Sequence, residues 1–150
     1  MNPDEVLEFE NRAYDMLHRA TTEYGCLSCD FLTGHKSNHK IYKEYKNEMT
    51  PTKYPMNLFA VAGSQASLPT KNQIYVLRFA NLCQTKYDDD SERGEEPEEE
   101  IAEGNPVILQ RTIPTKGSIN RIRSMMGYPI VALWNEAAQV KIYNVQNAMD

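Results

Sequence analysis

The chain has 150 residues, which is enough for one domain with a buried core and too few for two domains of ordinary size. Hydrophobic residues make up 41% of it, and no apolar run approaches the roughly 20 residues that a membrane-spanning helix needs, so no such helix is expected. Three cysteines, an odd number, favour reduced thiols and therefore a cytosolic or nuclear protein. The acidic N-terminus MNPDEVLEFE lacks the apolar core of a signal peptide, so secretion is not expected.

The net charge of −5 is concentrated in one acidic tract, residues 88–103. The tract holds ten acidic residues and one basic residue, whereas the rest of the chain holds 15 basic and 11 acidic residues. Acidity is therefore a property of this tract and not of the whole domain. The tract separates two runs that are typical of β-strands, QIYVLRFANL and PVILQRTI.

The first predicted element is a helix within residues 1–24. NPDE is a start signal, with Asn2 as the N-cap and Pro3 at the first helical position, although residues 2–9 either belong to the helix or lead into it. Gly25 is expected to end it, because glycine adopts the left-handed conformation common at helix C-termini. Apolar residues recur at spacings of three and four and form one stripe, and charged residues lie off this stripe. The stripe comprises Val6, Phe9, Ala13, Met16, Leu17 and Ala20, and the charged residues are Glu8, Arg12, Asp15 and Arg19.

After Gly25 the apolar period changes to two, which is typical of β-strands. About seven short strands, separated by links such as Gly117, Gly127–Pro129 and EAAQ, predict antiparallel sheets in a sandwich, barrel or propeller. Residues 33–54 are polar and lack apolar periodicity, so they are predicted to form a surface excursion. The predicted strands are CLSCDFL (26–32), LFAVAGSQ (58–65), QIYVLRFA (73–80), ILQRTI (108–113), INRIRSMM (119–126), IVALWN (130–135) and VKIYNV (140–145).

A zinc site is the alternative suggested by four residues with C-x2-C and H-x3-H spacings, Cys26, Cys29, His35 and His39. The five residues between the two pairs are too few for the hairpin and helix of a zinc finger. If CLSCDFL forms a strand, its two cysteines point to opposite faces and cannot both reach one ion without a turn. Cys29 is instead expected to be a small core residue on the face that it shares with Leu27 and Phe31. We therefore expect no metal and no other cofactor.

Several segments in order along the chain carry a resemblance. ILQRTIPTKGSINRIRSMMGYPIVALWNEAAQVKIYNV is similar to one WD repeat, with Tyr143 and Asn144 in the WD positions. With AYDMLHRATTEYGCLSCDFL, YPMNLFAVAGSQAS, IYVLRFANLCQTKYDDD and KGSINRIR, it resembles the N-terminal part of the glutamate-rich WD-repeat proteins. That family is related to the histone-binding retinoblastoma-binding WD proteins. The family usually has Pro at the position of Gly25 and often has His at the position of Thr115.

The resemblance implies a mainly β fold, the N-terminal fragment of a WD40 β-propeller of about seven blades. Residues 25–150 are expected to supply about one and three-quarter blades, after an N-terminal helix in residues 1–24. The remaining blades are then expected partners of this part of the protein. An acidic insertion at 88–104 is predicted to be disordered, because a carboxylate-rich tract cannot bury enough apolar surface to offset its ordering entropy.

The acidic tract has two interpretations, a solvated loop or an attractor of basic clients that mimics nucleic acid. Members of the resembled family chaperone core histones and escort a large-subunit ribosomal protein to nucleolar assembly. The resemblance therefore implies a binding protein of the nucleus and nucleolus, with basic protein clients and without direct contact with nucleic acid or membrane.

Client-binding residues are predicted in two places, the outer face of the N-terminal helix and the acidic tract. In the related histone-binding proteins the corresponding helix forms one wall of a groove for a client helix. Met16 and Leu17 are expected to anchor the helix to the body of the protein. The predicted client-binding residues are Glu8, Arg12, Asp15, Arg19, Asp88, Asp89, Asp90, Glu92, Glu95, Glu96, Glu98, Glu99 and Glu100.

The alternative function is a stand-alone β-sheet protein-interaction module without chaperone activity, which would use unpaired strand edges to associate with another sheet. An enzyme is not expected, because the sequence has no phosphate-binding glycine loop, no G-x-S-x-G motif and no paired carboxylates on rigid elements. Arg121 and Arg123 share a strand face, where they either form salt bridges at a blade edge or hold the acidic tract when no client is bound.

Overall fold

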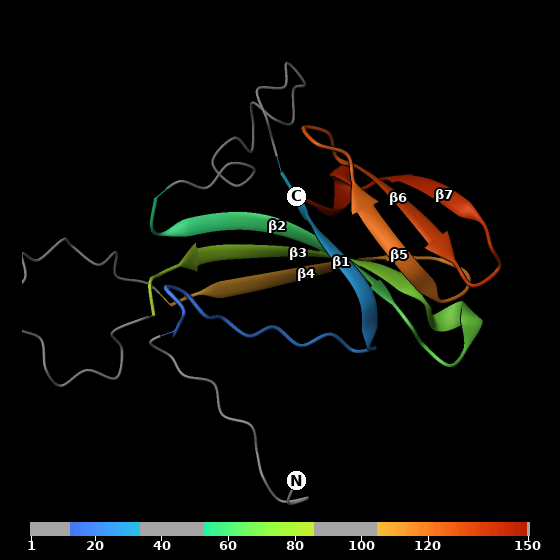
Figure 1. Cartoon of the computed structure of the whole chain (residues 1–150), viewed down its shortest axis with the longest axis horizontal. Coiled ribbons are helices and arrows are strands. Elements are labelled where there is room, and N and C mark those ends of the chain that lie inside the picture. Colours follow the sequence, from blue (N-terminus) through green and yellow to red (C-terminus); the bar gives the residue numbers. More distant parts are fainter. Residues whose placement is uncertain (1–12, 34–52, 86–104, 150) are drawn as a thin grey trace, which may run out of the picture.

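The computed structural model describes residues 13–33, 53–85 and 105–149, which form two antiparallel sheets (Figure 1). In both sheets the strands are neighbours in the order in which they follow along the chain. All seven predicted strands are present. The first sheet contains β1 (Cys26–Leu32), β2 (Met56–Ser64), β3 (Gln73–Leu82) and β4 (Val107–Pro114), and the second contains β5 (Ile119–Ser124), β6 (Ile130–Asn135) and β7 (Val140–Asn144).

This arrangement confirms the predicted fold class, a mainly β partial WD40 propeller. The four-stranded sheet is one complete blade, and the three-stranded sheet supplies three strands of a second blade. The WD-like repeat therefore straddles both sheets, since β4 closes the first blade and β5–β7 begin the second. In that repeat the Thr115 side chain is buried and its Oγ1 lies 3.1 Å from the Tyr143 hydroxyl oxygen. This bond joins the turn before β5 to the WD position in β7.

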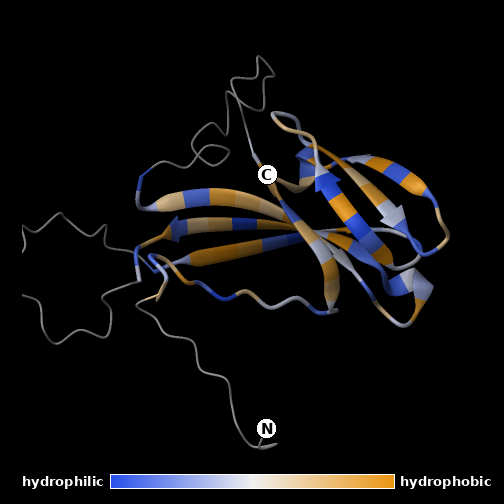
Figure 2. Cartoon of the chain, viewed as in Figure 1, coloured by the Kyte–Doolittle hydropathy of each residue, from blue (hydrophilic) through white to orange (hydrophobic). Residues whose placement is uncertain are grey.

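The main core lies between the two sheets and follows from the period of two along each strand. In β6, for example, Val131 and Leu133 are buried, whereas Ala132 and Trp134 are exposed. Figure 2 shows the same alternation of apolar and polar residues along β5. The buried residues of this core are Leu32, Phe59, Val61, Ile74, Val76, Ile119, Ile122, Val131, Leu133, Val145 and Met149.

The backbones of the two sheets approach each other at Gly63 in β2. A Cβ atom added to Gly63 would clash with the side chain of Ile119 in β5, so this contact requires glycine. The predicted turn at Gly117 is also present, with a φ of 83° that favours glycine. Both glycines thus help to set the position of the second sheet relative to the first.

Side chains also link the first strand of each sheet, β1 and β5. The Ser28 hydroxyl oxygen accepts the Ile122 N–H at 3.2 Å, and Asp30 Oδ2 accepts the Ser124 N–H at 2.9 Å. The Arg123 guanidinium donates to the backbone carbonyl of Cys29 at 3.2 Å. These bonds tie β1 to β5, so Arg123 has a structural role between the blades.

The predicted N-terminal helix is wrong over the described residues 14–24, which have no regular secondary structure. Gly25 does not adopt the left-handed conformation expected of a helix end, since the positive-φ glycines of the described ranges are Gly117 and Gly127. Tertiary hydrogen bonds explain the difference. The N–H of Leu17 donates to the Thr85 side chain just after β3, and the N–H of Tyr24 donates to the Tyr75 side chain in β3. Such tertiary contacts override helix propensity. Residues 1–12 lie outside the described part of the chain.

A second correction concerns the face of β1 that carries Leu27, Cys29 and Phe31. This face was expected in the core, yet Leu27 is 57% exposed and Phe31 is 56% exposed. The opposite face of β1 packs on β5. On the sheet face that carries Leu27 and Phe31, the buried residues of the second core cluster belong to β2 and β3. The surface excursion predicted at 33–54 and the acidic insertion at 88–104 fall almost entirely outside the described residues. Among the described residues, no helix is long and apolar enough to cross a bilayer.

Candidate functional site

Residues 13–24 run along the four-stranded sheet before they enter β1 (Figure 1). One end of this segment is fixed to the residues that follow β3. The Leu17 N–H donates to Thr85 Oγ1 at 2.9 Å, and the Thr85 N–H donates to the Asp15 carbonyl at 3.0 Å. His18 Nε2 lies 3.1 Å from the Cys83 carbonyl oxygen. Three hydrogen bonds therefore hold residues 15–18 against residues 83–85, which follow β3.

The other end of the segment is fixed to the start of β3. The Tyr24 N–H donates to the Tyr75 hydroxyl oxygen at 3.0 Å, and Tyr75 is fully buried in a second core cluster. The Gln73 amide donates to Glu23 Oε2 at 3.5 Å. A hydrogen bond to the Glu23 carboxylate is the main cause that raises the pKa of Tyr24. The segment is thus anchored at both ends of one strand and covers the second face of the first sheet.

The side chains of this segment divide into inward and outward groups. Met16, Leu17 and His18 are half-buried, whereas Asp15 and Arg19 are exposed. Anchoring by the side chains of Met16 and Leu17 stays a prediction, since the bond that holds Leu17 is made by its backbone N–H. Of the four client-binding residues predicted before the first strand, these two exposed residues are described, and Glu8 and Arg12 lie outside the described residues.

The acidic tract enters and leaves at the same end of the first sheet. The pairing of β3 with β4 ends at Ala80 and Val107, and Asn81 then adopts a positive φ of 57°. The Asn81 N–H donates to Asn57 Oδ1 at 2.9 Å, and its side-chain amide donates to the Asn105 carbonyl at 3.3 Å. These bonds fix the root of the tract, while the tract residues lie outside the described part. Those predicted client-binding residues are Asp88, Asp89, Asp90, Glu92, Glu95, Glu96, Glu98, Glu99 and Glu100.

The N-terminal segment therefore contacts the last described residue before the acidic tract. Thr85, which directly precedes the undescribed tract, exchanges hydrogen bonds with the backbone of Asp15 and Leu17. The backbone of Asp15 thus lies beside the root of the tract, and the Asp15 side chain is exposed. Sequence reasoning missed Thr85, because no local pattern indicates a contact between residues 68 positions apart.

The cysteines offer no assembled metal site within the described ranges. All three are free thiols, and Cys29 is exposed, which corrects its expected place in the core. Partial desolvation raises the pKa of the exposed Cys26 thiol, and a weaker effect of the hydrogen bond with Thr22 lowers it. No group of three potential ligands occurs among the residues described, and His35 and His39 lie outside them.

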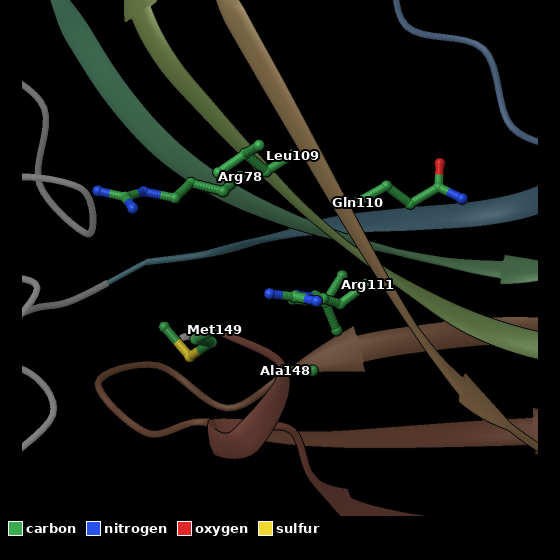
Figure 3. A pocket seen from close by; sticks show the side chains of 7 residues that line it. Arg78, Leu109, Gln110, Arg111, Ala148 and Met149 are labelled. Atoms are coloured by element: carbon green, nitrogen blue, oxygen red, sulfur yellow. The ribbon is translucent and has the colours of Figure 1, made fainter.

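A cavity of about 260 Å³ lies between the first sheet and the residues that follow β7 (Figure 3). Two arginines line it, Arg78 in β3 and Arg111 in β4. By the period of two, Val76 and Arg78 lie on one face of β3, and Arg111 lies opposite Val76 on the same face of β4. The cavity lining consists of Val76, Arg78, Leu109, Gln110, Arg111, Ala148 and Met149.

Comparisons with known proteins agree with the partial WD40 propeller described above. Residues 4–83 match the family model that describes histone-binding protein RBBP4 or a subunit of the CAF1 complex. A glutamate-rich WD repeat-containing protein 1 from Dictyostelium discoideum is 32% identical over 158 residues, which cover 98% of this chain and 30% of that protein. The ribosome assembly protein rrb1 of Schizosaccharomyces pombe is 24% identical over 151 residues, which cover 97% of this chain and 28% of that protein. The chain thus spans less than a third of the length of these two relatives, and no solved structure matches it significantly.

Proposed function

The chain belongs to the family of histone-binding protein RBBP4 and the matching subunit of the CAF1 complex, and from that premise we propose that it is the N-terminal part of a chaperone for basic proteins. The proposed clients are core histones or a large-subunit ribosomal protein, the latter because one relative is named a ribosome assembly protein. Clients of these kinds place the proposed activity in the nucleus and nucleolus. The role is binding and escort, without catalysis.

One observation carries this proposal, the hydrogen bonds between Thr85 and the backbone of residues 15–17. They hold the N-terminal segment beside the root of a tract with ten acidic residues and one basic residue. Such a concentration of negative charge attracts Lys- and Arg-rich proteins over a distance and raises their association rate. The proposed binding region therefore combines a fixed segment with a polyanionic tract.

Within this region the two parts have different proposed roles. The acidic tract accelerates the encounter with a basic client through long-range attraction, which ionic strength screens. The segment around Asp15 and Arg19 then contacts the client directly, since both side chains are exposed. Met16 and Leu17 hold the segment in place through their half-buried side chains.

The experiment that tests the proposal is stopped-flow association with a core histone. Five glutamates of the tract, Glu95, Glu96, Glu98, Glu99 and Glu100, are replaced by glutamine in one variant. We expect association at low ionic strength to slow by about tenfold or more, while dissociation changes little. As salt is raised, the association rate of the parent protein should also fall toward that of the variant. An unchanged association rate at low salt would leave the tract as a solvated spacer.

A second candidate function, a stand-alone interaction module, is favoured by the exposed apolar face of the second sheet. On this face Trp134 is 51% exposed, Val140 is 72% exposed and Ile142 is 73% exposed. Sedimentation at several concentrations, followed by thermal unfolding, distinguishes the candidates. A partial propeller self-associates or melts broadly, because each blade normally packs on two neighbours. A dilute monomer with a sharp two-state transition would favour the stand-alone module.

A further inference from the structure

The edge strands of the two sheets, β1, β4, β5 and β7, differ in how well their free edges are protected. β1 and β5 each contain an irregularity in their register, and β7 has only five residues. β4 has eight residues and pairs with β3 without an irregularity from Val107 to Pro114. Bulges and short lengths hinder the addition of another strand, whereas a long and regular edge permits it. The edge of β4, at the border of the first sheet in Figure 1, is therefore the least protected of the four.

The surroundings of β4 leave room for a further strand. Residues 107–112 are all exposed, and within the described ranges no segment forms a backbone hydrogen bond with the outer edge of β4. An open groove is lined by Gln110, Arg111 and Thr112 of β4 and by Asn147 and Ala148. Since Gln110 and Thr112 point to the opposite face from Arg111, this groove lies at the edge of the strand.

The sequence of β4 and its flanks, PVILQRTIP, suits pairing with a second copy of itself. Two antiparallel copies centred on Gln110 place Leu109 of one copy opposite Arg111 of the other, so the two positive charges are not directly opposed. Centring on Arg111 instead would bring the two guanidinium groups together, which is unfavourable. In the register centred on Gln110, Pro106 and Pro114 face each other at both ends, where a missing backbone N–H interrupts no bond of the paired stretch.

We propose that β4 is a dimerisation edge, to which a second copy of this chain adds its own β4 in antiparallel orientation about a twofold axis at Gln110. The two four-stranded sheets then form one continuous sheet, and the outward N–H and C=O groups of both edges are paired. Val107 is 46% exposed and Leu109 is 51% exposed, and the added strand removes part of this apolar surface from water. This interface is separate from the open face of the second sheet and does not rest on the proposed clients.

Cross-linking through introduced cysteines tests the register. In the full chain, Cys26, Cys29 and Cys83 are replaced by serine, and either Gln110→Cys or Thr112→Cys is added. Both positions are exposed and lie on the same face of β4. A short bis-maleimide should link two copies through position 110 about tenfold faster than through position 112, because the two residues 110 face each other and the two residues 112 lie about 13 Å apart along the strand.

A charge change tests which residue lies across the edge. Leu109→Glu should tighten dimerisation by about fivefold in sedimentation equilibrium, since each new carboxylate faces Arg111 of the second copy. Adding Arg111→Gln should remove this gain. Trp134→Ala, on the open face of the second sheet, is the control and should leave cross-linking through position 110 unchanged.

The proposal is overturned if positions 110 and 112 cross-link equally or if neither cross-links. It is also overturned if Leu109→Glu dimerises no more tightly than the parent. Loss of cross-linking in Trp134→Ala would likewise overturn it, because the copies would then meet at the second sheet.

Discussion

The two sheets follow the same alternation of apolar and polar residues, but they differ in how many of their faces are covered. In β2 of the first sheet, Val61 is fully buried on one face and Ala62 is 5% exposed on the other. In β6 of the second sheet, Leu133 is 1% exposed on one face and Trp134 is 51% exposed on the other. An identical strand pattern therefore leads to two different environments.

The difference lies in the segment 13–24. It is anchored along the second face of the first sheet through Tyr24 and Leu17, and no described segment lies on the corresponding face of the second sheet. Burial of a sheet face thus depends on a segment distant in sequence, and strand alternation alone does not reveal it. The second sheet presents Trp134, Val140 and Ile142 to a further blade or to another molecule.

The largest expected effect comes from replacing matched aromatic residues on the covered and the open face. Phe59→Ala should lower the free energy of unfolding by about 3–5 kcal/mol, because Phe59 lies in the core between the sheets. Trp134→Ala should lower it by less than about 1 kcal/mol, since the side chain is half exposed. Urea denaturation at low protein concentration measures both values. Equal losses would remove the distinction between the two faces.

A smaller effect is expected where the two sheets meet. Gly63→Ala should lower the free energy of unfolding by about 1–3 kcal/mol, because the new Cβ overlaps the Ile119 side chain and pushes β2 from β5. Gly25→Ala is the matched control, since no atom lies within 4 Å of its added Cβ. The control should stay within about 0.5 kcal/mol of the parent. The close approach of the sheets is contradicted if both variants unfold at the parent's urea midpoint.

The smallest effect concerns the segment that covers the first sheet. Tyr75→Phe removes the acceptor of the Tyr24 N–H and should lower the free energy of unfolding by about 1 kcal/mol. Hydrogen exchange at the Tyr24 amide should become faster, because that amide loses its partner. Tyr54→Phe, which changes an exposed tyrosine, is the control. If the Tyr24 amide exchanges at the parent's rate in Tyr75→Phe, the segment is held by other contacts.

The strands and their order were predictable from the sequence, because a period of two is a local property that the fold preserves. The course of residues 13–24 was not, since the apolar spacing of Ala13, Met16 and Leu17 suits a helix as well as a non-helical segment held by distant partners. Its partners, Thr85 and Tyr75, become neighbours only when the first sheet has formed. Exposure of Leu27 and Phe31 depends likewise on which segment covers β1.

The candidate site was predictable in part. Charge counting located the acidic tract, and Asp15 and Arg19 are exposed although no helix forms at residues 14–24. The contact of the N-terminal segment with Thr85 required the structure, because it depends on where β3 ends and how this segment crosses the sheet. The cavity with Arg78 and Arg111 also required it, since the residues after β7 form one of its walls.

The most direct test of the account compares two charge reversals at opposite ends of the structure. Asp15 lies beside Thr85 at the root of the acidic tract. Glu136 lies in the turn after β6, and the N–H of Glu136 donates to the Ser118 carbonyl. The association rate of a core histone at low ionic strength is measured for Asp15→Lys and Glu136→Lys. We predict a rate about threefold or more below that of the parent for Asp15→Lys, and a rate within about twofold for Glu136→Lys. Equal slowing by both variants would contradict a client site at the N-terminal segment.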